Sequence, residues 1–137
     1  LTLVVHPDHP WVVKKTVPLE QLVTQPFIMR ESGSGTRKVI ARILEAGGLK
    51  ESDLQEVAEI GSSAAVKEAV KSGIGVSILS GCAVSDDVDC GRLVTVQVKG
   101  VQLERPFYLI RRKNRELSPV AAVFYDYLLK EAEGESQ

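Results

Sequence analysis

The feature that most constrains the fold is a unit of strand, loop and helix that occurs twice. The first unit predicts a short apolar strand at residues 27–29 and, after a polar loop, an amphipathic helix that ends at Gly47 and Gly48. The second predicts a strand at residues 57–60 and a helix from Ser62 to Ser72. Alternating strands and helices are typical of layered α/β folds rather than of separate α and β regions.

Further elements are predicted on both sides of this pair. Buried or half-buried strands are expected at residues 1–5, 74–79 and 93–99. We expect a helical turn at residues 19–23 and a uniformly apolar segment at residues 107–110. The last helix is predicted to begin at Ser118 and Pro119, because a serine cap followed by a first-turn proline is a favoured helix start. Its inward stripe is predicted to comprise Val120, Val123, Phe124, Tyr127 and Leu128.

Composition and charge exclude several classes of protein. The 137 residues are 44% hydrophobic and 26% charged, which is typical of a globular domain. Lys and Arg number 17 against 18 Asp and Glu, whereas nucleic-acid-binding domains usually have a basic excess. No apolar run approaches the roughly 18 residues that cross a bilayer. The one dense basic run, interpreted as a solvated strand end, is Arg111, Arg112, Lys113 and Arg115.

The residue types that hold metals are sparse. Cys82 and Cys90 are too few for a disulfide framework and lack zinc-site spacing, so we expect reduced thiols in the cytosol. His6 and His9 lie in a proline-marked segment that is expected to be an extended loop. No Cys or Glu stands near them at ligand spacing, which disfavours a metal site.

Catalytic patterns are equally thin. The Gly-x-Ser-x-Gly motif is absent, and no histidine or carboxylate pair stands out as a general acid or base. Asp86, Asp87 and Asp89 fail the calcium-loop spacing and predict a polar turn. Trp11 fits either a hinge contact or a surface anchor. We therefore expect neither an enzyme nor a cofactor.

Residues 30–37 form the most informative stretch. Gly33 and Gly35 let the backbone turn tightly and approach a ligand closely. The following helix start offers unpaired N–H groups and partial positive charge, which suit an anion. The stretch lacks the Gly-Lys-Ser/Thr ending of a phosphate-binding P-loop and is not a dinucleotide fingerprint. Two interpretations stay open: an anion-binding loop, or a capped helix start without a ligand. The hydroxyls that the loop offers are those of Ser32, Ser34 and Thr36.

Six short motifs follow one another along the chain. They are Leu3-Val4-Val5 with His9-Pro10, the octapeptide Arg30-Glu31-Ser32-Gly33-Ser34-Gly35-Thr36-Arg37, Val66-Lys67-Glu68-Ala69-Val70 after Gly61-Ser62, Gly73-Ile74-Gly75-Val76-Ser77-Ile78-Leu79-Ser80, Phe107-Tyr108-Leu109-Ile110, and Leu117-Ser118-Pro119. In this order and spacing, over nearly the whole chain, they resemble the C-terminal effector-binding (substrate-binding) domain of LysR-type bacterial transcription regulators, truncated at its start.

The resemblance implies a periplasmic-binding-protein-like (type 2) α/β fold, with a mixed sheet flanked by helices. Residues from about 10 to 85 would form the second lobe. Residues 1–9 and about 92–137 would be the crossover and the elements that return to an incomplete first lobe. The resemblance also implies a cytoplasmic, non-enzymatic sensor that binds a small anionic metabolite between two lobes and self-associates as a dimer or tetramer. DNA would be contacted only through a winged helix-turn-helix that is absent from this chain, and no membrane partner is implied.

The resemblance also assigns site residues. The loop that would bind the effector through backbone N–H groups and hydroxyls comprises Ser32, Gly33, Ser34, Gly35, Thr36 and Arg37. Arg37 would either add charge or pair with a neighbour. Ser62 and Ser63 match the start of the second helix, where capping is their main expected role, and in the family that helix lies at the dimer face. The octapeptide resembles that of regulators of sulfur assimilation and carbon fixation, which indicates an anionic metabolite.

Two other functions are compatible with the same fold. A transport-type solute-binding protein would carry a secretion signal or lipoprotein cysteine upstream, where a regulator carries a winged helix. An enzyme such as a phosphoribosyl transferase would need acidic metal or base residues near the loop, and the sequence shows none there. Fold alone does not separate these functions; the ordered motifs favour the regulator.

Overall fold

The computed structural model describes residues 1–106, 108–114 and 116–134, which fall into two units, Leu1–Pro106 and Phe107–Gln137. The elements of the first unit are β1 (Thr2–Val5), α1 (Trp11–Lys14), β2 (Thr16–Val17), the 3-10 helix η1 (Leu19–Thr24), β3 (Pro26–Arg30), α2 (Gly35–Ala46), the 3-10 helix η2 (Glu51–Asp53), β4 (Gln55–Ile60), α3 (Ser63–Lys71), β5 (Ser77–Leu79), α4 (Gly81–Asp89) and β6 (Val94–Val98). The second unit contains α5 (Pro119–Gly134).

The strands of the first unit form two small sheets that are joined side by side. One has the order β2-β6-β1-β5, with β1 antiparallel to β5 and β6, and β2 parallel to β6. The other pairs β3 with β4 in parallel. Between the sheets, Ile28 N–H donates to the Val76 carbonyl (2.9 Å) and Val76 N–H donates to the Pro26 carbonyl (2.8 Å). The predicted mixed α/β architecture is therefore confirmed.

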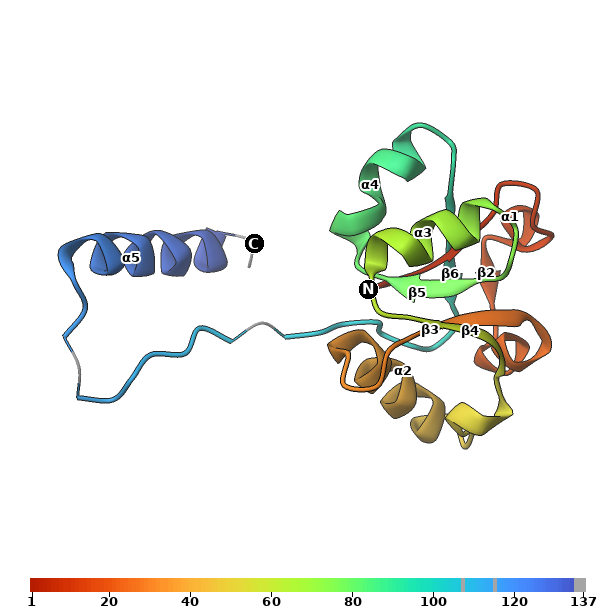
Figure 1. Ribbon diagram of the computed structural model, residues 1–137, viewed down its shortest axis with the longest axis horizontal. Coiled ribbons are helices and arrows are strands. Elements are labelled where there is room, and N and C mark those ends of the chain that lie inside the picture. The colour runs from red at the N-terminus through yellow and green to blue at the C-terminus, as the bar shows by residue number, and fades with distance from the viewer. Residues whose placement is uncertain (107, 115, 135–137) are drawn as a thin grey trace. The chain divides into compact units, whose positions relative to one another are not determined.

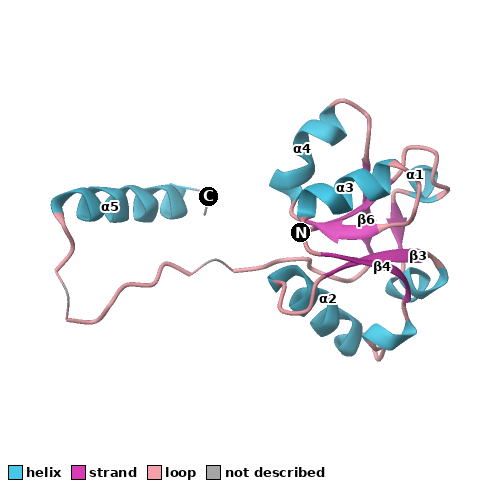
Figure 2. Ribbon diagram, viewed as in Figure 1, coloured by secondary structure: helices cyan, strands magenta, loops and turns pink. Residues whose placement is uncertain are grey.

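Successive strand residues point to opposite faces, which divides the core in two. Leu3 and Phe27 lie in one cluster with the apolar face of α2. Val4 and Ile28 lie in the other, with the buried faces of α3 and α4. Figures 1 and 2 show the resulting layers, with α2 on one side of the strands and α3 and α4 on the other. The predicted amphipathic character of α2 is confirmed, since its large apolar side chains are buried on one face: Val39, Ile40, Ile43 and Leu44.

Two local expectations are wrong. The proline-marked segment is not extended, because His9 N–H donates to the His6 carbonyl (2.9 Å) and Pro10 starts the short helix α1. Trp11, in that helix, is buried with its ring edge-on to His9. The acidic cluster that contains Asp87 is not a turn but part of α4, and Asp87 is buried against Lys67 of α3 and Arg92.

The second unit shows the predicted helix and its predicted start. Ser118 Oγ accepts a hydrogen bond from Ala121 N–H (3.3 Å), so the serine-proline start is confirmed. A single helix with one extended segment has little apolar surface of its own to cover such a stripe. Phe107 and Arg115 lie outside the described residues, and residues 108–110 are not a strand. Four residues of the predicted inward stripe are exposed: Val120, Val123, Phe124 and Tyr127. Within the described part of the chain, no helix is long and apolar enough to span a bilayer.

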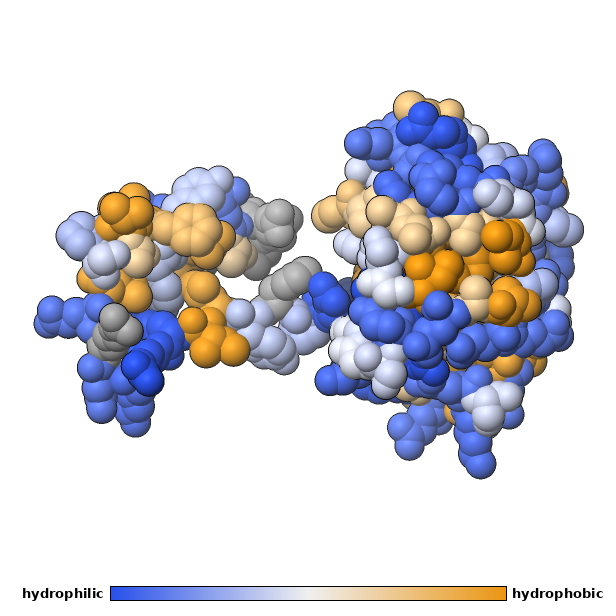
Figure 3. Space-filling model, viewed as in Figure 1, coloured by the Kyte–Doolittle hydropathy of each residue, from blue (hydrophilic) through white to orange (hydrophobic). Residues whose placement is uncertain are grey.

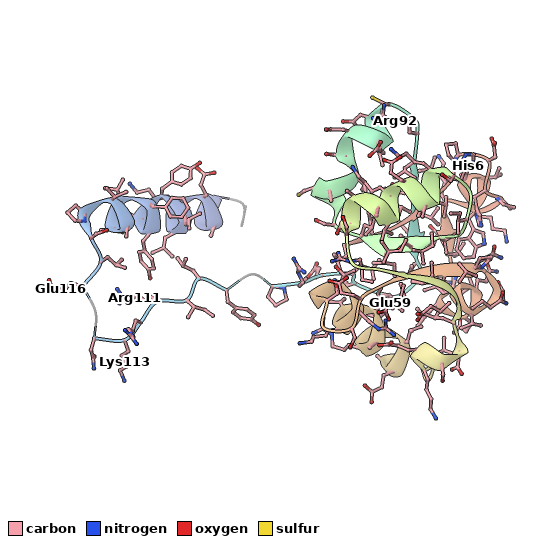
Figure 4. All side chains as sticks on the ribbon, in the orientation of Figure 1. His6, Glu59, Arg92, Arg111, Lys113 and Glu116 are labelled. Carbon is pink, nitrogen blue, oxygen red and sulfur yellow. The ribbon has the colours of Figure 1, made fainter. Side chains whose placement is uncertain are left out.

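Asp87 ties α3 to α4 and to the segment that follows α4. Its carboxylate lies 2.7 Å from Lys67 Nζ, 3.1 Å from Lys71 Nζ and 2.9 Å from Arg92 Nε. Only 5% of its side chain is exposed. The hydrogen bond from Lys67, together with those from Lys71 and Arg92, holds the pKa of Asp87 well below its ordinary value. Figure 4 labels Arg92 at the α4 end of this cluster.

Replacing Asp87 should remove an acid-sensitive part of the stability. Because the folded-state pKa is lowered from 3.8, the ionised carboxylate stabilises the fold above that value, and this contribution is lost as the pH falls towards the folded-state pKa. Asp87→Asn should therefore lower the urea midpoint at pH 7 and reduce its decline below about pH 4. The exposed neighbour Asp86→Asn is the control. Equal midpoints and equal acid profiles for both variants would contradict this role.

Gly75 is required by the approach of two backbones. A Cβ at this position would lie 2.5 Å from the Pro26 carbonyl oxygen, which accepts the Val76 N–H bond between the sheets. Gly75→Ala should therefore lower the free energy of unfolding by roughly 1–3 kcal/mol in a denaturant titration. Gly81→Ala is the matched control, since a Cβ there meets nothing within 4 Å. An alanine at Gly75 that costs no more than one at Gly81 would show that the junction tolerates a side chain.

Candidate functional site

The two strand-loop-helix units place two helix starts at one edge of the β3–β4 sheet. The strands are parallel, and beyond a register shift between Phe27 and Ile28 they stay paired to their ends, with Arg30 opposite Ile60. The chain then enters α2 at Gly35 and α3 at Ser63, so both helices begin at the same end of the strand pair (Figure 1). The first turn of a helix has N–H groups without intrahelical acceptors and a partial positive charge. The edge is therefore suited to a negatively charged ligand.

The loop before α2 is a tight turn followed by a capped helix. Ser34 N–H donates to the Glu31 carbonyl (3.1 Å), and Gly33 has a φ of 97°, a left-handed conformation that favours glycine. Ser34 is the N-cap, and its Oγ accepts a hydrogen bond from Thr36 N–H (3.3 Å). Ser34 and Thr36 are buried, whereas Gly33 is exposed. The glycine turn was predicted, and a capped helix start was one of the two interpretations left open by the sequence.

A cation that the sequence did not single out lies beside this loop. A Cβ built on Gly35 would come within 2.8 Å of Arg105 Nη1, so the absence of a side chain at Gly35 makes room for the guanidinium. Arg105 is far from the loop in sequence, and its position depends on how residues after β6 cross α2. Arg42 Nη2, on α2, donates to the Glu104 carbonyl in the same crossing segment (3.4 Å).

Arg37, a predicted loop residue, is held by neighbouring carboxylates. Its Nε donates to Glu51 Oε2 (2.9 Å), and its Nη1 donates to Glu59 Oε2 (2.6 Å) and to the Arg30 carbonyl (2.9 Å). Figure 4 labels Glu59 on β4. Burial lowers the pKa of Arg37, but the hydrogen bonds to the two glutamates outweigh it and raise that pKa above its ordinary value. Of the two predicted roles, pairing with neighbours is the one seen in the structure.

The two serines at the start of α3 differ from their expected capping role. Ser62 occupies the N-cap position, but its side chain makes no capping hydrogen bond. Ser63 Oγ instead accepts a hydrogen bond from Arg30 Nη1 (2.5 Å). Arg30 also binds Glu31, and this hydrogen bond lowers the pKa of Glu31. The sequence predicted capping because Arg30 lies in the other strand-loop-helix unit. Arg30 becomes a neighbour of Ser63 only when β3 pairs with β4.

Other surface features lie away from this edge. An open groove of about 550 Å³ lies between η1, the C-terminal end of α2 and residues 99–102, at the opposite end of α2 from the loop. Cys82 and Cys90 are free and exposed, on α4 and at its C-cap. Over residues 1–106, 108–114 and 116–134, no group of three or more His, Cys, Asp or Glu side chains could hold a metal ion.

Comparisons with known proteins agree on one family. The sequence matches the LysR substrate binding domain over residues 1–133. It is 39% identical over 136 residues to the HTH-type transcriptional activator CmpR of Synechocystis sp., which covers 99% of this chain and 44% of that protein. It is 35% identical over 132 residues to a RuBisCO operon transcriptional regulator of Allochromatium vinosum, covering 96% of this chain and 43% of that protein. The chain therefore spans less than half the length of these relatives.

Solved structures show the same fold. The Synechocystis PCC6803 CcmR regulatory domain in complex with 2-PG has a TM-score of 0.83 and 28% identity, covering 94% of this chain and 61% of that chain. The effector binding domain of QuiR in complex with shikimate has a TM-score of 0.80 at 19% identity, covering 97% of this chain and 61% of that one, and it shows the fold alone. The predicted periplasmic-binding-protein-like fold is confirmed, and the chain belongs to the LysR substrate-binding domain family.

Proposed function

We propose that this chain is the effector-sensing part of a LysR-type transcription regulator that binds a small anionic metabolite at the loop before α2. The observation that carries the proposal is the convergence of two helix starts and the Arg105 guanidinium at one edge of the β3–β4 sheet. The similarity to the CcmR regulatory domain, which was solved with 2-PG, supports a small-molecule ligand. The residues proposed to contact the effector are Ser32, Gly33, Ser34, Gly35 and Thr36.

The proposed site is a preorganised turn, where neutral N–H and hydroxyl donors lie beside the Arg105 guanidinium. The loop backbone is already fixed by the Ser34 cap and the left-handed Gly33, so a ligand would bind without the cost of ordering it. Ligand binding would shift the populations of two arrangements of the regulator and so alter its affinity for DNA. DNA contact would come from a domain outside this chain. The proposed protein is therefore a cytoplasmic sensor rather than an enzyme.

Removing the loop hydroxyls should weaken effector binding. Ser34→Ala and Thr36→Val should each lower the affinity of the full-length protein for 2-PG about fivefold to tenfold in calorimetric titrations, because each removes one hydrogen-bonding group. Thr36→Ser, which keeps the hydroxyl, should retain most of the affinity. Inorganic phosphate serves as a second probe of the same site.

The control variant is Thr24→Val on η1, whose hydroxyl donates to the Gln21 carbonyl away from the loop. Its affinity for both probes should equal that of the wild type, and effector-free binding to operator DNA should be unchanged in every variant. Wild-type affinity in both Ser34→Ala and Thr36→Val would contradict the assignment of the loop.

We propose further that a second copy of the regulator covers the face formed by α3 and β4. Val57 on β4 and Ile74 after α3 are about half exposed, at 51% and 52%. Figure 3 shows apolar surface in this region, over α3 and the strands next to it. Among the described residues β4 pairs with β3 alone, so one strand edge also stays available. Exposed apolar patches of this kind are typical of interaction surfaces.

A charge on this face should weaken self-association. Val57→Glu or Ile74→Glu should raise the dissociation constant of the full-length oligomer at least tenfold in sedimentation velocity, because the carboxylate would be desolvated at the interface. The control is Val13→Glu on α1, an exposed valine on another part of the first unit. Equal dissociation constants for all three variants would place the interface elsewhere.

A further inference from the structure

The Arg30 side chain joins two segments that the chain itself keeps apart. Its Nε lies 2.8 Å from Glu31 Oε2, and its Nη2 donates to Glu31 Oε1 (3.0 Å). On its other side, Nη1 donates to Ser63 Oγ (2.5 Å) and Nη2 donates to the Gly61 carbonyl (3.3 Å). The side chain is 15% exposed, so these contacts are made at a partly buried position.

These contacts fix the entrance of the loop from several directions. Glu31 is the first residue after β3. Its carboxylate accepts hydrogen bonds from two nitrogens of the Arg30 guanidinium, and this geometry fixes the relative orientation of the two groups as well as the distance between them. The Glu31 carbonyl accepts the turn-closing bond from Ser34 N–H. The Arg30 carbonyl accepts a bond from Arg37 in the first turns of α2. The loop geometry therefore depends on the position of residues 30 and 31.

The same guanidinium fixes the start of α3. Ser63 is the first residue of α3, and Gly61 lies in the short connection between β4 and that helix. Arg30 therefore bridges the two helix starts at the sheet edge, and a shift of the loop entrance would be transmitted to α3 through a short chain of hydrogen bonds. The hydrogen bond from Arg30 accounts for a serine at position 63. A role for Ser63 as a direct ligand of the effector would not account for this contact.

We propose that Arg30 is a positioning residue for the effector loop: through Glu31, Ser63 and Gly61 it makes the geometry of the loop and the position of α3 depend on each other. The proposal deepens the proposed function and rests on the assignment of the loop as the effector site. It also assigns Ser63 an indirect role, in which its hydroxyl affects the loop only through Arg30.

The bridge can be tested without a ligand by amide hydrogen exchange in the full-length protein. Arg30→Gln should raise exchange about tenfold at the hydrogen-bonded amides of Ser34 and Thr36 in the loop and of Val66 in α3, while α4 keeps its wild-type rates. Ser63→Ala should raise exchange in residues 31–36 as well, although that loop is distant in sequence. Arg30→Lys can keep only part of the fork and should fall between the wild type and Arg30→Gln. The matched control is Arg42→Gln on α2, whose side chain reaches Glu104 instead.

Affinity for 2-PG then separates positioning from direct contact. Arg30→Gln and Ser63→Ala should each weaken binding about tenfold, and the double variant should be no weaker than Arg30→Gln alone, since both remove the same bridge. Additive losses would make Ser63 a direct ligand and overturn its indirect role. Exchange in Ser63→Ala that rises only in residues 62–66, or Arg30→Gln rates equal to those of Arg42→Gln, would overturn the bridge itself. Weak 2-PG binding by the wild type would count against the effector assignment and leave the exchange test decisive for Arg30.

Discussion

Two backbone hydrogen bonds between β3 and Val76 hold the first unit together as one layered body. They link β3, which pairs with β4 on one side, to the segment leading into β5 on the other. Ser77 Oγ adds a bond to the Ile28 carbonyl (2.7 Å) at the same junction. Because Ile28 packs toward α3 and Phe27 toward α2, the junction also sets both helices relative to the strands. The positions of the two helix starts at the edge of the β3–β4 sheet therefore depend on this junction.

The two arginines beside that edge make contacts within the protein. Arg30 and Arg37 both lie beside the loop, yet their guanidinium groups are engaged with glutamates, a serine and backbone carbonyls. In the proposed effector site, recognition of an anion would therefore fall mainly to the first-turn N–H groups and the loop hydroxyls. A site built from dipoles and hydroxyls responds to the shape of a ligand as well as to its charge, which is appropriate for distinguishing one metabolite from another.

The features that the sequence predicted well are those encoded by neighbouring residues. The spacing of Val39, Ile40, Ile43 and Leu44 predicted the buried face of α2, and Ser118 with Pro119 predicted the start of α5. The tight turn at Gly33, which has a left-handed backbone conformation, was also predicted. The ordered motifs then identified the family and its fold, which the comparisons confirm.

Features that depend on partners far along the chain were missed. The burial of Asp87 requires Lys67 and Lys71 from α3. Considered without these lysines, the acidic segment has the pattern of a polar turn. The bond from Arg30 to Ser63 exists only because β3 and β4 are parallel neighbours. The stripe on α5 has helical spacing whether or not it is covered, so periodicity alone does not identify what Val123 and Phe124 pack against.

The position of β1 has a consequence for how the domain forms. β1 is an apolar strand early in the chain, but both of its neighbours, β5 and β6, follow the two strand-loop-helix units. Closing these long loops costs entropy before any pairing is gained, so this sheet should form more slowly than the local β3–β4 pair. During synthesis Leu3 and Val4 cannot pair until β5 has left the ribosome. Until then they present an unpaired apolar edge to chaperones and to other nascent chains.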